Sequence, residues 1–270
     1  VEKGVHGDFL FVKKGTGTLK LQGQDFWFWP AKGTVIEAGT IEVAGPAAAS
    51  NNIEEQVLGP QVTLKNGATL TFNSNTTDKH GYENIKTDLI IEDGAEVTVN
   101  FDRNLVHTGK LVGGKDVVFN MGLKYLREHF MGDWSAFEGR INMTPWEPFD
   151  GSGVANFIMC DTLGIAEYDA DGNFTNIYHV DTFQVDPAKQ EQGYTYSTRV
   201  SVGYPKAHIH LNDNAVLFSG GNMSNSAASH AYPIDDKART FIGALTGTAA
   251  STLAGGCQQR DSYHEVNWYI

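Results

Sequence analysis

Two histidines separated by one residue form the most obvious potential ligand pair in this chain of 270 residues. His208 and His210 flank Ile209, so an extended strand places both imidazoles on the same face. Two imidazoles at that spacing can share a metal ion. Neither a carboxylate nor a cysteine stands beside them at a diagnostic spacing, so we predict no metal site and no cofactor, with His208 and His210 kept only as metal-ligand candidates.

A second group of residues has the chemistry of an enzyme that cleaves a polymer. Such an enzyme needs carboxylates, and commonly a cation, on outward positions of neighbouring strands. Asp133, Glu138 and Arg140 fit that description, and alternation puts Glu138 and Arg140 on one outward face, where we expect them to pair with each other. Any solvated sheet offers a similar set, and the chain has no nucleophile elbow, phosphate-binding loop or zinc signature.

An aromatic run is the third group with binding chemistry. In DFWFWP, residues 25–30, an extended backbone places Phe26 and Phe28 on one side and Trp27 and Trp29 on the other. Trp27, Trp29 and, later in the chain, Trp146 could stack on sugar rings. The run could instead cover the open end of a stacked core, which the first unit of a repeat protein requires. We favour the cover.

These side chains need elements that position them, and the sequence shows such elements as a recurring corner. Residues 61–72, QVTLKNGATLTF, carry apolar residues at matching offsets on both sides of Gly67. The same layout surrounds Gly94 in DLIIEDGAEVTV and Asn214 in HIHLNDNAVLF. Three copies at distant places indicate a structural repeat.

The corners predict a parallel β-helix rather than hairpins. A tight hairpin would set Ile91 opposite Glu96 on one face and so mix core with solvent positions. A chain that turns a corner without pairing back lets alternate residues point inward, and Gly or Asn tolerates the positive φ there. With one rung about every 20 to 30 residues, this pattern predicts an all-β solenoid. The predicted inward residues include Leu64, Leu70, Ile91, Val97, Leu211 and Leu217.

One segment resembles a known repeat family. In residues 8–43, VKKGTGTLKLQG and then TVIEAGTIEV place glycines at corner positions, with Leu19, Leu21, Val35, Ile41 and Val43 as inward residues. This run is similar to the autotransporter-associated β-strand repeat. The resemblance implies a right-handed parallel β-helix of bacterial secreted or surface proteins, some with polysaccharide-processing modules of the pectin-lyase type. It also extends over residues 57–143 and 207–270, whereas the aromatic loop 25–30 departs from it.

The sequence divides into three parts of one structural domain. Residues 1–143 contain rungs and the aromatic loop, residues 144–205 form an insertion with a β-hairpin around residues 165–180, and residues 206–270 continue the rungs. Residues 123–130 have helical spacing and suggest one short helix. The last residues, VNWYI, lie in an apolar strand, so we expect the missing remainder of a longer chain as a partner.

The charge and cysteine content of the chain limit the functions that it can have. The net charge of −12, without a basic cluster, argues against nucleic acid and anionic membrane surfaces as partners, and no transmembrane span is predicted. Cys160 and Cys257 are expected to be free thiols rather than a bridge. Together with the resemblance, this favours a non-catalytic stalk or adhesin-like module, secreted or on the bacterial cell surface, that contacts polysaccharide. The alternative is a polysaccharide lyase or glycoside hydrolase that uses the outward face.

Overall fold

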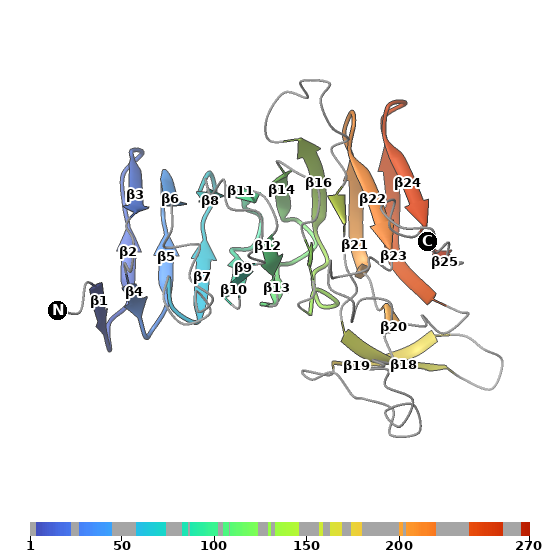
Figure 1. Cartoon of the computed structure of the whole chain (residues 1–270), viewed down its shortest axis with the longest axis horizontal. Helices are drawn as coiled ribbons and strands as arrows, with labels where there is room; N and C mark the ends of the chain where they lie inside the picture. The colour runs from blue at the N-terminus through green and yellow to red at the C-terminus, as the bar shows by residue number, and fades with distance from the viewer. Residues whose placement is uncertain are drawn as a thin grey trace, which may run out of the picture.

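The computed structural model consists of β-strands without helices in the residues that it describes (Figure 1). These residues are 4–22, 27–44, 58–73, 83–85, 87–101, 105–107, 109–123, 129–130, 133–145, 157–158, 163–168, 174–179, 200–201, 204–219, 238–255 and 266–270. None of the described residues forms a helix long and apolar enough to cross a membrane.

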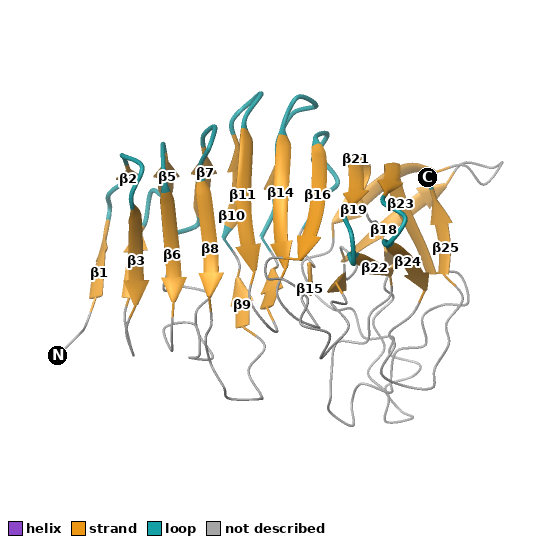
Figure 2. Cartoon of the chain, turned by 90° about the horizontal axis from the view of Figure 1, so that it is seen from above, coloured by secondary structure: helices purple, strands orange, loops and turns teal. Residues whose placement is uncertain are grey.

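Parallel sheets run along the length of the molecule, so the predicted β-solenoid is confirmed (Figure 2). One five-stranded sheet contains β2 (Phe11–Lys13), β5 (Thr34–Ile36), β7 (Gln61–Leu64), β10 (Asp88–Ile91) and β13 (Leu111–Val112). A second sheet has nine strands and carries the candidate site. Its members are β3 (Thr18–Gln22), β6 (Thr40–Ala44), β8 (Thr69–Asn73), β11 (Glu96–Phe101), β14 (Val118–Leu123), β16 (Arg140–Pro145), β21 (Tyr204–Leu211), β23 (Ala238–Gly247) and β25 (Val266–Tyr269).

Shorter strands close the remaining sides of the rungs. β9 (Glu83–Ile85), β12 (Leu105–His107) and β15 (His129–Phe130) form a three-stranded sheet, and β1 (Gly4–Gly7) pairs with β4 (Trp27–Pro30). Later in the chain, β17 (Phe157–Ile158), β22 (Val216–Ser219) and β24 (Thr252–Gly255) form another.

The three corners have the backbone conformation that the sequence predicts. Gly67, Gly94 and Asn214 have φ values of 77°, 73° and 65°. The alanine after each corner residue is buried, and its amide donates to the carbonyl three residues earlier, as in Ala95 to Glu92 at 3.0 Å. Local sequence therefore sets the turn at each of these positions.

One continuous core fills the solenoid, as alternation predicts. The six inward residues predicted from the three corner copies are at most 3% exposed: Leu64, Leu70, Ile91, Val97, Leu211 and Leu217. The largest buried side chain, Trp134, lies within an aromatic series whose ring centroids are 5.0 to 5.5 Å apart from Phe101 through Phe130 and Trp134 to Tyr204. Stacked rungs thus share their apolar contacts, which is why no rung needs a core of its own.

The third copy of the corner motif occupies a different side of the solenoid from the first two. The strands before Gly67 and Gly94 are β7 and β10 of the five-stranded sheet, whereas the strand before Asn214 is β21 of the nine-stranded sheet. The local corner is therefore the same although the strand before it belongs to another side of the solenoid.

Two further expectations are corrected. Val35 points outward, because β5 pairs with β7 so that Ile36 lies beside Leu64 and Thr34 takes the other inward position. The buried Thr34 hydroxyl donates to the carbonyl of Leu58 at 2.9 Å, which satisfies it in the core. No helix spans residues 123–130, since Leu123 ends β14 and residues 129–130 form β15.

The insertion contains the predicted hairpin. β18 (Leu163–Tyr168) pairs antiparallel with β19 (Phe174–His179) and also with β20 (Val200–Ser201). These strands form a small sheet at the lower right of Figure 1. Cys160, Cys257 and Trp146 lie outside the described residues.

A buried histidine completes the core. His107 is fully buried, its Nε2 donates to the carbonyl of Thr87 at 2.9 Å, and its Nδ1 has no partner among the described residues. Its ring packs against Trp134 and Phe101. Burial lowers the pKa of His107 to about 4, although the Thr87 carbonyl opposes that shift. The imidazole is therefore neutral in the folded protein at neutral pH.

Candidate functional site

The polar side chains with the most distinctive arrangement lie on three adjacent strands of the nine-stranded sheet. In the register of β16 and β21, Arg140 lies beside His208 and Asn142 beside His210, and β23 then places Thr246 beside His210. The intervening Ile141 and Ile209 are fully buried, so the polar residues point outward. Pairing of these strands unites residues that are up to about a hundred positions apart in the sequence.

The two histidines converge on one hydroxyl. Nε2 of His208 and Nδ1 of His210 each lie 2.8 Å from Oγ1 of Thr246. A hydroxyl has a single proton, so at least one imidazole nitrogen donates to it. The pKa of His208 is lowered, first by partial burial and then by the positive charges of Arg140 and His210. Arg140 is the permanent cation of this group, and its charge disfavours protonation of the neighbouring His208.

A chain of amide hydrogen bonds fixes the arginine. Nε of Arg140 donates to Oδ1 of Asn142 at 2.7 Å, and Nδ2 of Asn142 donates to Oδ1 of Asn120 at 2.8 Å. Nδ2 of Asn120 in turn donates to a Glu96 carboxylate oxygen at 2.9 Å. Asn142 and Asn120 were not identified from the sequence. Each asparagine directly follows an inward residue, Ile141 or Phe119, and this shared position could have indicated that the two lie side by side on the outward face.

The proposed catalytic residues do not converge. Glu138 forms an ion pair with Lys206 at 3.2 Å rather than with Arg140, so the expected pairing of Glu138 with Arg140 is wrong. Asp133 lies before the corner that leads into β16, and its Oδ1 accepts hydrogen bonds from the Ser135 amide and hydroxyl at 3.1 and 2.6 Å. No hydrogen bond or ion pair joins Asp133 to Glu138 or Arg140 in the described part of the chain.

His208 and His210 have no further metal ligands beside them among the described residues. Within the described residues, no group of three or more His, Cys, Asp or Glu side chains is placed to hold a metal ion. His208 and His210 hydrogen-bond to the Thr246 hydroxyl, and the permanently charged group that acts on His208 is the Arg140 guanidinium; neither is a normal metal ligand.

The aromatic run divides between core and surface. Phe28 is buried, and its ring lies 4.8 Å from that of Phe11 and 6.3 Å from that of Phe9, both edge-on. Trp29 is half-buried on the other side of β4. Phe28 therefore packs at the N-terminal end of the core, whereas the Trp27 side chain and Trp146 lie outside the described residues.

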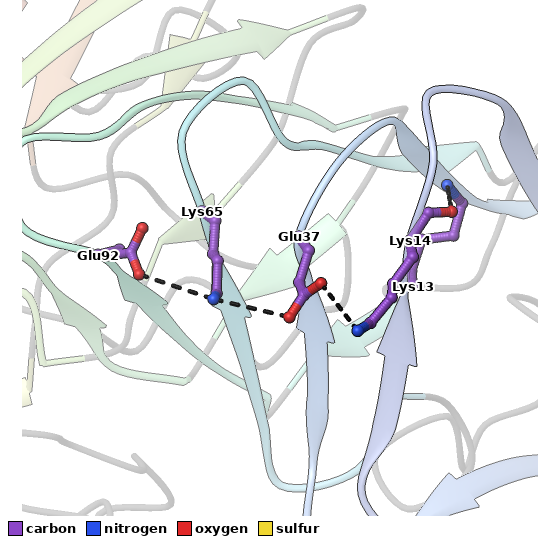
Figure 3. A network of polar contacts seen from close by, with 5 residues as sticks. All are labelled: Lys13, Lys14, Glu37, Lys65 and Glu92. Atoms are coloured by element: carbon purple, nitrogen blue, oxygen red, sulfur yellow. Dashed lines mark hydrogen bonds and ion pairs between the residues drawn. The ribbon is translucent and has the colours of Figure 1, made fainter.

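Most of the described ion pairs join neighbouring rungs. At one corner, Lys14, Glu37, Lys65 and Glu92 alternate in charge, with N–O distances of 3.4, 3.7 and 3.9 Å between successive members (Figure 3). Lys20 pairs with Glu42 at 3.2 Å on the nine-stranded sheet. We call the first series the corner charge row.

The corner charge row begins beside a buried lysine that the sequence did not reveal. The ammonium of Lys13 donates to the carbonyls of Lys14, Gly15 and Ala38 at 3.1, 2.7 and 3.0 Å. Its alkyl chain takes the inward place that Ile36 has in the next rung. Lys13 therefore satisfies corner carbonyls at the N-terminal end of the core.

The comparisons with known proteins find no match for this chain. No protein-family model matches it, and neither a curated protein nor a solved structure is significantly similar to it.

Proposed function

We propose that this chain is a non-catalytic β-solenoid module, stalk-like or adhesin-like, of a secreted or cell-surface bacterial protein. The observation that carries the proposal is the pairing of outward charges between rungs. A hydrolase or lyase needs carboxylates that converge on a substrate and keep distinct protonation states. Here Glu138 and Glu37 are each matched by lysine, and Asp133 is held by Ser135.

The arrangement of the rungs supports a structural role. Successive strands of a parallel sheet are about 4.8 Å apart, so each added rung lengthens the solenoid without changing its cross-section. Figure 1 shows this stacking along the long axis. The similarity of residues 8–43 to the autotransporter-associated β-strand repeat also supports a bacterial surface or secreted location.

Contact with carbohydrate is the second part of the proposal. Trp29 lies partly exposed on β4, on the opposite side from the buried Phe28. Tryptophan combines a flat apolar face with a hydrogen-bond donor, which suits it to stacking on a sugar ring. We propose that Trp27 and Trp29 provide this contact at the N-terminal end.

Activity assays on a panel of neutral and acidic polysaccharides test the proposal. We expect neither new reducing ends nor unsaturated products from the protein or from Glu138→Gln. Turnover that Glu138→Gln or Arg140→Gln abolishes would establish the polysaccharide lyase or glycoside hydrolase alternative. Polysaccharide that quenches tryptophan fluorescence in the parent protein but not in Trp29→Ala would support the contact, and identical quenching in both would contradict it.

A further inference from the structure

The outward face of β16 and β21 carries Arg140, a permanent cation, beside two histidines, in a chain whose net charge is −12. Arg140 and His208 are register partners on adjacent strands, and parallel strands are about 4.8 Å apart. His210 follows on the same face. We call Arg140, His208 and His210 the cationic triplet.

The acidic residues near the cationic triplet are already engaged. Glu138 shares the outward face of Arg140, but Lys206 neutralises it at 3.2 Å. Glu96 lies two strands from Arg140 and accepts a hydrogen bond from Asn120. The sequences RINMTP, YPKAHIHL and ARTFIGALTG of the three strands contain no acid. The triplet therefore differs from the corner charge row, where each lysine faces a carboxylate.

Hydrogen-bond donors of the triplet remain available. Nε of Arg140 is bonded to Asn142, which orients the guanidinium and leaves its terminal N–H groups without partners among the described residues. His208 and His210 each use one ring nitrogen on Thr246, and the other nitrogens have no hydrogen-bond partner in the same set. An imidazole that accepts from the hydroxyl has its N–H at that other nitrogen, whereas one that donates to the hydroxyl gains a second N–H only when it is protonated. An orienting bond lowers the entropy cost of binding a ligand to the free donors.

From this geometry we infer that the cationic triplet is a binding site for a sulfate-type or phosphate-type oxyanion. The guanidinium supplies a planar, permanently charged fork that matches oxyanion geometry. An imidazole that accepts from Thr246 supplies a further N–H donor, and one that donates to Thr246 supplies a donor when it is protonated. An anion also offsets the repulsion between Arg140 and a protonated imidazole of His208. This inference concerns a ligand of the sheet surface and is independent of the stalk assignment.

The pH dependence of binding follows from the groups that face His208. These are Arg140 on β16, His210 on its own strand, the Lys206–Glu138 pair and the uncharged Thr246 on β23. A bound anion favours the protonated imidazole and so raises the pKa of His208. Binding must therefore strengthen as the pH falls through the range in which His208 takes up a proton, which lies below the usual range of histidine.

Proton NMR titration of the histidine ring signals, in sodium sulfate and in sodium chloride of equal ionic strength, tests the site. We expect sulfate to raise the pKa of His208, whereas chloride leaves it lowered. In Arg140→Gln, we expect sulfate affinity to fall about tenfold or more. Lys20→Gln removes a lysine from another part of the same sheet and should retain the sulfate effect. Equal pKa values in the two salts, or an undiminished effect in Arg140→Gln, would overturn the inference.

A second arm identifies the source of the oxyanion. Dextran sulfate, uncharged dextran and free sulfate are compared for binding to the parent protein. A higher affinity for dextran sulfate than for free sulfate would show that the triplet binds a sulfate group carried by a polymer. Equal affinity per sulfate group would show that it binds the free ion. Binding of uncharged dextran with the same affinity as dextran sulfate would contradict an oxyanion site.

Discussion

The corner charge row and the cationic triplet differ in how stacking of rungs arranges the outward charged side chains. In the row, Lys65 lies between Glu37 and Glu92, so stacking of rungs brings each charge to a neighbour of the opposite sign. In the triplet, Arg140 meets His208, which has the same sign when protonated. Stacking can thus either cancel charge internally or accumulate it. Accumulated charge is what a ligand can recognise.

The two arrangements also belong to different regions of the solenoid. The row lies among the first rungs, which follow one another without a long insertion, whereas the triplet joins β16 to strands that follow residues 146–203. The same inward row nevertheless runs through both regions, because Leu70, Val99, Met121, Met143 and Leu211 are successive register partners. The outward faces differ while the core is shared.

The largest expected effects come from breaking that shared core in each region. Leu70→Ala and Leu211→Ala remove fully or nearly fully buried side chains, exposed 0% and 2%. Each should lower the free energy of unfolding by about 2 to 5 kcal/mol. Chemical denaturation followed by circular dichroism measures the change. A Leu211→Ala variant that destabilises only a separate, minor transition would show that the two regions do not fold as one unit.

The next effect sharpens the comparison between a buried and a surface histidine. The pKa of His107 is about 4 in the fold against about 6.5 when unfolded, so between these values the unfolded chain binds more protons. The contribution of His107 to the free energy of unfolding is therefore fully present above about pH 6.5. It decreases by about 3 kcal/mol as the pH falls to 4.

Denaturation at several pH values checks the His107 prediction. His107→Phe should flatten the dependence of stability on pH between about 7 and 4, whatever its effect at neutral pH. His208→Gln, on the outward face, should leave that slope nearly unchanged. An unaltered slope in His107→Phe would remove His107 as its origin.

Glycine corners provide a smaller and more local test. Gly39 and Gly94 share a φ of 73°, but a Cβ on Gly39 would lie 2.5 Å from the Gly15 carbonyl oxygen, whereas nothing lies within 4 Å of one on Gly94. Gly94→Ala should therefore cost about 1 to 2 kcal/mol from the backbone conformation alone. Gly39→Ala should cost more. Equal melting temperatures for the two variants would contradict the close approach of the first two corners.

The smallest effect is expected from the corner charge row itself. Lys65→Gln removes both ion pairs of a side chain that is 39% exposed, and should cost less than about 1 kcal/mol. The difference should shrink at high salt, because salt screens exposed charges. Lys115→Gln alters an exposed lysine without an ion pair among the described residues and serves as the control. A salt-independent loss in Lys65→Gln would indicate lost packing instead.

The sequence by itself determined the corners and the inward rows. Positive φ at Gly94 and alternation around it depend on adjacent residues, so QVTLKNGATLTF and its copies predicted the solenoid and its core. The same local logic placed His208 and His210 together on an outward face. It erred at Val35, where the register with Leu64 decides which residues face inward.

Only the tertiary structure decided which sheet each strand joins and which polar groups meet. β21 precedes the same kind of corner as β7 and β10, but it pairs with β16 in the nine-stranded sheet. Arg140 binds Asn142 while Glu138 binds Lys206, 68 residues away. Alternation fixes the face of a side chain within its own strand. Its partners across the sheet depend on the register between rungs, which is set by packing over the whole core.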